Sequence, residues 1–333
     1  MQHPPPLGLS ILDAFGNTPM IELRHIVRSR GLDGRLLAKL EYLSPGFSKK
    51  DRIALEMIRE ARADGSLGEG QAVVELTSGN TGTGLAIVCR ALGHPFVAVM
   101  SKGNSIERAR MMLALGAEVV LVEQAVGSPP GQVSGEDLAR VDQRACELAE
   151  ERGAFRANQF TLQAAVSAHE RFTGPEIWEQ AQGHVDVFLD FVGTATTFTG
   201  VMRFLQTRNP DIRGYVVEPA SAPILAADPI TNMSHRIQGG GYSRSVDDLP
   251  LFDPRLATDF LTVTDEQAIE GARILAREEG VFGGFSSGAH VAAAIELLAQ
   301  RECGATIVFL VCDSGLKYMS TDLYPCHEQI AAR

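Results

Sequence analysis

The amino-acid sequence predicts an α/β fold with mostly parallel sheets, because short apolar segments alternate with helical patterns along most of the chain. Apolar residues at helical spacing between 138 and 148 indicate one amphipathic helix, and Thr264 opens another through a capping box with Gln267. Repeated strand, helix and strand segments form parallel sheets with helices on both faces. The six segments that indicate buried strands are 72–76, 95–100, 118–123, 185–192, 214–218 and 306–312.

Length and charge limit the classes of protein to which the chain can belong. It has 333 residues, 45% of them hydrophobic, which is enough for a large core and for two lobes that share one fold. Its formal net charge of -11 would repel a phosphate backbone, so no nucleic-acid partner is expected. It contains no run of about 18 apolar residues and no leader-like start, so we expect no membrane partner and a soluble, cytoplasmic protein.

Cysteine and histidine give no sign of a disulfide framework or a metal site. The five cysteines are scattered and form no CxxC pair, which is typical of reduced thiols in a protein core. The eight histidines show no spacing of the HExxH kind. The sequence therefore predicts no metal cofactor.

Two adjacent lysines open a predicted helix in the segment Ser48-Lys49-Lys50-Asp51-Arg52. Ser48 and Asp51 have the spacing of a capping box, which would place both lysines in the first helical turn. The positive end of the helix dipole disfavours an ammonium group there and pushes a lysine toward the neutral form that Schiff-base chemistry requires. Two solvated surface lysines are the alternative, and this segment alone does not exclude them.

Glycines and hydroxyl side chains follow two predicted strands where a helix begins, at residues 75–84 and 193–197. Free N–H groups at such helix starts bind phosphate or carboxylate groups, although a simple capped helix has the same composition. Segments 283–288 and 312–315 have a similar character. No Walker loop or GxGxxG motif is present, so a nicotinamide cofactor is not expected.

Eight ordered segments carry a resemblance to a known family: Gly16-Asn17-Thr18-Pro19, Lys39-Leu40-Glu41, Ser44 to Arg52, Thr77 to Gly82, Asn158-Gln159-Phe160, Thr173 to Trp178, Ser286-Ser287-Gly288 and Asp313-Ser314-Gly315. They resemble the cysteine synthase and cystathionine β-synthase family of fold type II enzymes, which depend on pyridoxal 5'-phosphate. Among its members, the chain looks most like the O-acetylserine sulfhydrylases. The resemblance implies two three-layer αβα lobes and a homodimer.

The resemblance also implies a role for individual residues. It gives Lys50 the catalytic Schiff base, because the family's lysine directly precedes Asp-Arg. Ser314 would face the pyridine nitrogen, with Asp313 as its local rival, and a neutral hydroxyl there favours elimination over transamination. The other cofactor-binding residues that it implies are Asn80, Gly193, Thr194, Ala195, Thr196 and Thr197. The substrate-binding residues that it implies are Thr77, Ser78, Thr81, Gln159, Gly240, Ser243 and Arg244.

Three departures from the family pattern bear on these assignments. Ala195 and Thr196 replace two glycines of the usual phosphate loop, and a threonine tolerates positive φ poorly. Residues 238–245 border the family's second-substrate pocket, where Ser243 and Arg244 could recognise an anionic nucleophile larger than sulfide. Cys312, Leu316 and Lys317 replace a proline and a Glu-Arg pair around the last motif.

The expected function is β-replacement on an O-activated L-serine, O-acetylserine or O-phosphoserine, through an aminoacrylate. Sulfide is the first choice of nucleophile, which makes cysteine the product. An amine or amino-acid nucleophile, as in diaminopropionate-type synthesis, is the nearest alternative. Serine or threonine dehydratase and cystathionine β-synthase activities are further alternatives. We expect a smaller mobile lobe over residues 47–150, and a larger lobe of residues 1–46 plus 151–333 that carries the phosphate loop.

Overall fold

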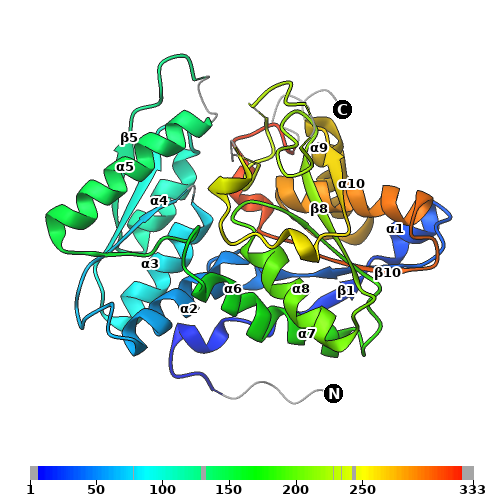
Figure 1. The fold of residues 1–333 in the computed structure, drawn as a ribbon, viewed down its shortest axis with the longest axis horizontal. Coiled ribbons are helices and arrows are strands. Elements are labelled where there is room, and N and C mark those ends of the chain that lie inside the picture. Colours follow the sequence, from blue (N-terminus) through cyan, green and yellow to red (C-terminus); the bar gives the residue numbers. More distant parts are fainter. Residues whose placement is uncertain are drawn as a thin grey trace.

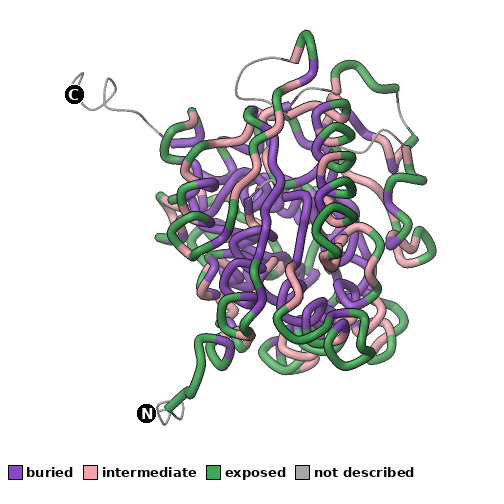
Figure 2. The backbone as a smooth tube through the Cα atoms, turned by 90° about the vertical axis from the view of Figure 1, so that its left-hand side faces the viewer, coloured by how far each residue is buried: buried purple, intermediate pink, exposed green. Residues whose placement is uncertain are grey.

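The chain folds into two sheets, each covered by helices on both faces (Figure 1). The computed structural model describes residues 7–77, 79–128, 133–227, 229–233, 235–241 and 245–324. Within these ranges, no helix combines the length and the apolar character that crossing a bilayer requires. Figure 2 shows the buried backbone gathered at the centre of the molecule and the exposed backbone around it.

The larger sheet has six strands in the order β1-β2-β10-β7-β8-β9. Neighbouring strands run parallel, except that β1 pairs with β2 in antiparallel register. The central strands are buried on both faces, which explains their continuous apolar sequences. The strands span Met20–Glu22 (β1), Arg35–Lys39 (β2), Val187–Phe191 (β7), Arg213–Pro219 (β8), Asp259–Val263 (β9) and Thr306–Leu310 (β10).

The smaller sheet has four parallel strands in the order β5-β4-β3-β6. They span Val73–Leu76 (β3), Phe96–Ser101 (β4), Glu118–Val122 (β5) and Phe155–Arg156 (β6). Strand β6 therefore lies just beyond residue 150, the boundary expected for the smaller lobe.

Helices of both lobes pack their apolar faces on these sheets. Helices α1, α9 and α10 cover one face of the larger sheet, and α7 and α8 cover the other. Helices α2, α3, α4 and α6 share a core with the smaller sheet, whose other face is covered by α5. The helices are Arg24–Ser29 (α1), Lys50–Ala63 (α2), Asn80–Leu92 (α3), Ile106–Ala114 (α4), Gly135–Arg152 (α5), Ala164–Ala168 (α6), Gly174–Gln180 (α7), Thr196–Arg208 (α8), Asp265–Glu279 (α9) and Phe285–Gln300 (α10).

The predicted α/β class and all six predicted strands are confirmed, as is the capping box of Thr264 with Gln267. Strands β1, β6 and β9 were not predicted, because they have two to five residues and lie at or near sheet edges. Strand β2 is not among the six predicted strands; of the segment Lys39-Leu40-Glu41, which carries part of the resemblance, Lys39 ends β2 and Glu41 opens a 3-10 turn.

Candidate active site

A cavity of about 280 Å³ opens where strands of both sheets end. Leu76 ends β3 of the smaller sheet, and Gly193 follows β7 of the larger one. Ligands of open α/β sheets bind at the carboxyl ends of the strands. The residues that line the cavity are Lys50, Leu76, Asn80, Thr81, Gly135, Leu138, Ala139, Asp142, Asn158, Gln159, Phe160, Gly193, Thr194, Gly239, Gly240 and Asp248.

The two adjacent lysines have different surroundings. Lys50 lines the cavity, and its Nζ donates a hydrogen bond to Thr194 Oγ1 at 3.2 Å. Lys49 is buried, and its Nζ lies 2.7 Å from Asp190 Oδ1. Burial, and next the charge of Lys49, lowers the pKa of Lys50 to about 7. Near neutral pH about half of the Lys50 amines are therefore uncharged and able to act as nucleophiles.

The capping box expected between Ser48 and Asp51 is wrong. Lys49 is the N-cap residue of α2, and no side chain caps the helix. Asp51 instead turns back, and its Oδ2 accepts a hydrogen bond from the N–H of Gly46 at 2.6 Å. A side chain at residue 46 would place its Cβ 2.2 Å from Asp51 Oδ1, so any larger residue there would displace the Asp51 carboxylate. The turn before α2, rather than a local cap, therefore fixes the direction in which Lys50 leaves the helix.

The segment from residue 77 to 82 forms a tight turn into α3. Thr77 Oγ1 accepts hydrogen bonds from the N–H groups of Gly79 at 3.0 Å and Gly82 at 2.8 Å, which gives the buried Thr77 a part in folding the turn. Thr81 Oγ1 donates to Gln159 Oε1 at 2.6 Å, and both residues line the cavity. Ser78 lies outside the described residues.

The loop of residues 193–197 leads from β7 into α8. Its backbone accommodates Ala195 and Thr196 at the two positions where the family usually has glycine. Ala195 takes the left-handed conformation with φ of 62°, whereas Thr196 is the first residue of the helix. The strain therefore falls on a small residue, at a cost of about 1 to 2 kcal/mol. No side chain caps α8, so the N–H groups of its first turn remain available to an anion.

A second glycine segment packs against this loop. Gly193 and Gly240 are so close that a Cβ at residue 193 would lie 2.6 Å from the carbonyl oxygen of Gly239. Residues 193 and 240 both border the cavity, so a ligand there meets backbone from two sides. Ser243 and Arg244 lie outside the described residues.

Asn80 is held at the cavity by a network that the sequence did not reveal. Asn80 Nδ2 donates to Asp313 Oδ2 at 2.6 Å, and the hydroxyl of Tyr318 donates to the same oxygen at 2.5 Å. Lys317 Nζ donates to Asn80 Oδ1 at 2.7 Å. Ser314 Oγ accepts the N–H of Leu316 at 3.3 Å, which leaves its own O–H free to donate. Both bonds fall on Oδ2 of Asp313, and its buried Oδ1 has no hydrogen-bond partner.

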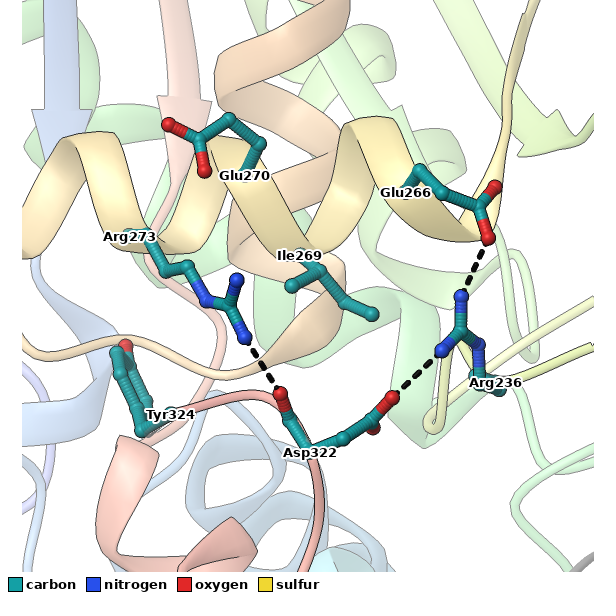
Figure 3. A pocket seen from close by; sticks show the side chains of 7 residues that line it. All are labelled: Arg236, Glu266, Ile269, Glu270, Arg273, Asp322 and Tyr324. Atoms are coloured by element: carbon teal, nitrogen blue, oxygen red, sulfur yellow. Dashed lines mark hydrogen bonds and ion pairs between the residues drawn. The ribbon is translucent and has the colours of Figure 1, made fainter. Parts of the chain in front are cut away.

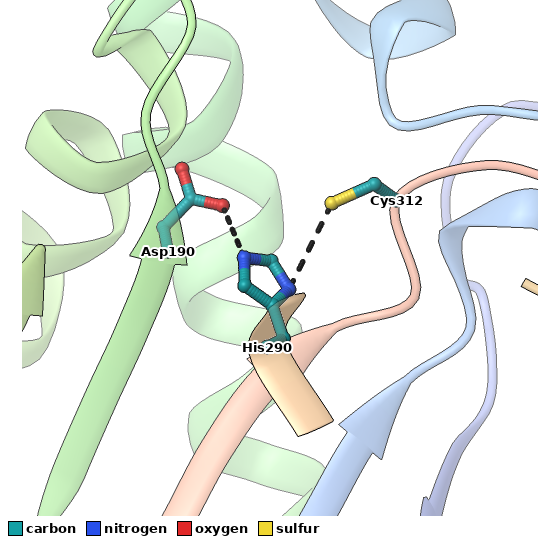
Figure 4. Close-up of side chains that lie close together, drawn as sticks. All are labelled: Asp190, His290 and Cys312. Atoms are coloured by element: carbon teal, nitrogen blue, oxygen red, sulfur yellow. Dashed lines mark hydrogen bonds and ion pairs between the residues drawn. The ribbon is translucent and has the colours of Figure 1, made fainter. Parts of the chain in front are cut away.

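Four ionisable groups gather beneath the cavity, and Figure 4 shows three of them, Asp190, His290 and Cys312. Burial alone would lower the pKa of His290, but Cys312 and Asp190 raise it to about 9, which favours a charged ring. The hydrogen bonds of the ring contradict that charge, because the N–H of Phe191 needs a lone pair on Nε2. His290 Nδ1 lies 2.7 Å from the carbonyl oxygen of Leu310, and its Nε2 accepts the N–H of Phe191 at 2.5 Å. The ring is therefore neutral with its hydrogen on Nδ1, and both nitrogens are occupied. Lys49, the fourth group, supplies the cation that Asp190 binds.

A separate hollow of about 540 Å³ lies beside α9 (Figure 3). Arg236 pairs there with Asp322 at 2.5 Å and with Glu266 at 2.5 Å, and Arg273 donates to the carbonyl oxygen of Asp322 at 2.8 Å. Its charged groups thus already have protein partners, and it lies apart from Lys50.

The residues at the cavity fit pyridoxal phosphate. Its aldehyde needs an uncharged amine, which Lys50 offers at neutral pH. Its phosphate needs hydrogen-bond donors and closely approaching backbone, which the start of α8 and the Gly193–Gly240 contact provide. The hydroxyls of Thr194 and Thr196 lie 3.0 Å apart at the same loop.

Known proteins with similar sequences and structures share this cofactor chemistry. The family model described as pyridoxal-phosphate dependent enzyme matches residues 11–313. "Cysteine synthase 3" of Caenorhabditis elegans is 41% identical over 314 residues, which cover 94% of this chain and 88% of that protein. "Cysteine synthase" of Staphylococcus aureus is 37% identical over 318 residues, with 95% and 96% covered.

Two solved structures extend the comparison to the fold. O-acetylserine sulfhydrylase isoform 3 of Entamoeba histolytica superposes with a TM-score of 0.87 at 32% identity, covering 97% of this chain and 94% of that one. O-ureido-L-serine synthase superposes with a TM-score of 0.84 at 34% identity, covering 98% and 100%. The expected resemblance and fold type are thereby confirmed, and the chain belongs to the family of pyridoxal-phosphate dependent enzymes.

Proposed function

We propose that the chain catalyses β-replacement on an O-activated L-serine, with sulfide as the nucleophile and cysteine as the product. The observation that carries this proposal is the placement of the Lys50 amine in a cavity beside both an uncapped helix start and the Thr81–Gln159 pair. The relatives named cysteine synthase and O-acetylserine sulfhydrylase support the choice of reaction.

Lys50 is the proposed catalytic residue. Pyridoxal phosphate, when bound, makes the α-proton of an amino acid acidic and allows a β-substituent to leave. A lysine whose pKa is about 7 can accept that proton at neutral pH and return it later, which an ordinary lysine, charged at this pH, cannot do. Thr194 holds the Lys50 amine at 3.2 Å while it is unbound.

Thr81, Gln159 and the N–H groups at the start of α3 are proposed to bind the carboxylate of the amino-acid substrate. Thr77 accepts the N–H of Gly82, but the N-cap residue of α3, Gly79, has no side chain to cap the helix, and the helix dipole favours a negative group at this start. Gln159 is fixed by its Nε2, which donates to the carbonyl oxygen of Leu76 at 3.2 Å. The pair therefore presents a preformed polar surface at the end of β3.

Ser314 is proposed as the partner of the cofactor's ring nitrogen, and Asn80 as the partner of its phenolic oxygen. The hydroxyl of Ser314 accepts the N–H of Leu316 and can donate its own hydrogen, whereas Asp313 binds Asn80 and Tyr318 through Oδ2 and retains an unpartnered Oδ1 as its rival. A neutral partner leaves the ring a weaker electron sink, which favours loss of a β-substituent over transamination.

The lobe of residues 47–150 is proposed to close over the cavity. Leu76 and Asn80 approach the cavity from this lobe, and Gly193 and Gly240 approach it from the rest of the chain. Closure would exclude water from the reacting atoms. By resemblance to the family, we further propose a homodimer in the cytoplasm.

An amine nucleophile is the second candidate. Asp142 and Asp248 are among the residues that line the cavity, where a cationic or amine-bearing nucleophile would meet opposite charge. Asp142 is already paired with Arg156 at 2.7 Å, which reduces this attraction and leaves sulfide as the first candidate.

Product analysis decides between the candidates. The purified protein is incubated with O-acetyl-L-serine or O-phospho-L-serine, first with sulfide and then with L-amino acids that carry a second amine. We expect cysteine from sulfide and no product from the Lys50→Ala variant. Release of ammonia from unmodified serine or threonine would indicate a dehydratase. If no donor and acceptor pair gives a β-substituted product, the proposal fails.

A further inference from the structure

Lysine is rare in this chain, and it is buried at most of its positions. Five of the 30 cationic residues are lysines, and of these Lys102 alone is exposed. Lys39 and Lys317 hold polar groups in ion-pair and hydrogen-bond networks, and Lys50 lines the cavity. Lys49 is the remaining lysine, and the proposed reaction gives it no part.

Lys49 ties the start of α2 to the strand that leads into the loop at residues 193–197. Its side chain is 10% exposed, and its Nζ lies 2.7 Å from Asp190 Oδ1, whose side chain is 2% exposed. Asp190 belongs to β7, four residues before Thr194, which accepts the hydrogen bond of Lys50. The ion pair therefore fixes the two elements that bring Lys50 and Thr194 together.

A buried ion pair of this kind is poorly explained by stability. Removing two charges from water costs several kcal/mol, and apolar residues of similar size often stabilise a protein equally well or better. The second carboxylate near Lys50, Glu75, is paired with Arg156 at 3.2 Å. Burial lowers the pKa of His169 well below its usual value, so that ring is uncharged as well.

The charges around Lys50 therefore have a definite pattern. Lys49 lowers the pKa of Lys50, whereas Asp190, Cys312 and Glu75 raise it, and the effect of Lys49 exceeds that of Asp190. Asp190 in turn keeps Lys49 charged, because this carboxylate raises the pKa of Lys49 against the effect of burial. The neutral ring of His290 adds no charge to the pair.

We propose that Lys49, held by Asp190, is a positioning residue for Lys50. The ion pair fixes the Lys50 amine against Thr194 and keeps a positive charge behind it, so that Lys50 is uncharged when an aldehyde arrives. This inference rests on the proposed role of Lys50 and explains how a lysine at that position becomes reactive near neutral pH.

The test measures the reactivity of each lysine in the cofactor-free, full-length chain. The protein is labelled with an amine-acylating reagent between pH 5 and pH 10, and peptide mass mapping gives the pH of half-labelling for Lys50. Lys49→Met removes the charge, Lys49→Arg retains it, and Lys102→Met is the matched control at an exposed lysine. The double variant Lys49→Met/Asp190→Leu removes the pair without leaving a buried unpaired charge.

We expect half-labelling of Lys50 near pH 7 in the wild type, in Lys49→Arg and in Lys102→Met. In Lys49→Met it should rise by about one pH unit or more, which makes Lys50 about fivefold or more less reactive at pH 7. The double variant should show a smaller rise, because the loss of Asp190 acts in the opposite direction.

An unchanged half-labelling pH of Lys50 in Lys49→Met would overturn the inference. If Lys49→Met does not fold, an unchanged half-labelling pH in the double variant would overturn it instead. A purely structural role for the pair would change the unfolding midpoint without moving this pH. The labelling needs no substrate, so a failure of the proposed reaction would leave its result intact and the two outcomes can be told apart.

Discussion

Replacement of Arg52 by methionine tests how the start of α2 is anchored. Arg52 lies on α2 two residues after Lys50, and its guanidinium is buried between two carboxylates. Its Nε and Nη2 donate to Glu41 at 2.6 and 2.8 Å, and its Nη1 and Nη2 donate to Glu176 at 2.7 Å each. Lys39 Nζ lies 2.6 Å from Glu176 and cannot neutralise both acids alone.

The structure gives the size of the effect in two ways. Removing one member of a buried ion pair costs about 3 to 5 kcal/mol, because the partner is left charged and unpaired. Burial alone would raise the pKa of Glu176, but Arg52 and Lys39 lower it to about 2 from its usual 4.5. That difference corresponds to about 3 kcal/mol of stability, present above pH 4.5 and lost as the pH falls toward 2.

Urea unfolding at pH 7 and at pH 3 measures both effects. We expect Arg52→Met to lose about 3 to 5 kcal/mol at pH 7 and considerably less at pH 3, where Glu176 of the variant is protonated. Arg144→Met is the matched control on the surface of α5, and its loss of stability should be far smaller than that of Arg52→Met. Equal losses in Arg52→Met and Arg144→Met, or a loss that does not depend on pH, would refute the reasoning.

Three further predictions follow from single contacts. Gly288→Ala should destabilise the chain by about 3 kcal/mol or more in urea, because its Cβ would lie 1.9 Å from the carbonyl oxygen of Ala268; an unchanged midpoint would contradict this. Asp137→Ala should lower stability in thermal unfolding by about 1 to 2 kcal/mol without changing cofactor affinity, since it removes the capping box of α5 and a bond from the N–H of Ala125. Uptake of pyridoxal phosphate by the cofactor-free chain, followed by absorbance, should be about tenfold faster at pH 8 than at pH 6 and then level off, because Lys50 has a pKa of about 7. An ordinary lysine would instead give about a hundredfold rise with no plateau by pH 9.

The fold could be predicted from the sequence wherever the residues of a single helix or strand are enough to determine its structure. The buried strands are apolar without interruption, and Thr264 with Gln267 marks a helix start that the structure retains. The same reasoning predicted a capping box between Ser48 and Asp51, which is wrong because Asp51 accepts its hydrogen bond from the N–H of Gly46 in the preceding turn. Spacing alone does not tell which of two available N–H groups a carboxylate will bind.

The site could be predicted only in part, because several of its contacts join distant segments. Lys50 and Thr194 are 144 residues apart, and Lys317 lies 237 residues from Asn80. The small number of lysines in the chain was the available signal for Lys317 and Lys49. The pairing of Lys49 with Asp190 joins residues 141 positions apart in the sequence, which no local pattern predicts.

The most direct test of the central claim is a peptide map of the cofactor-loaded protein after reduction with borohydride. Reduction makes the bond between the cofactor and its lysine permanent, and mass spectrometry then locates it. The account predicts a label on Lys50. A label on Lys49 or Lys317, or no label on any lysine, would contradict it.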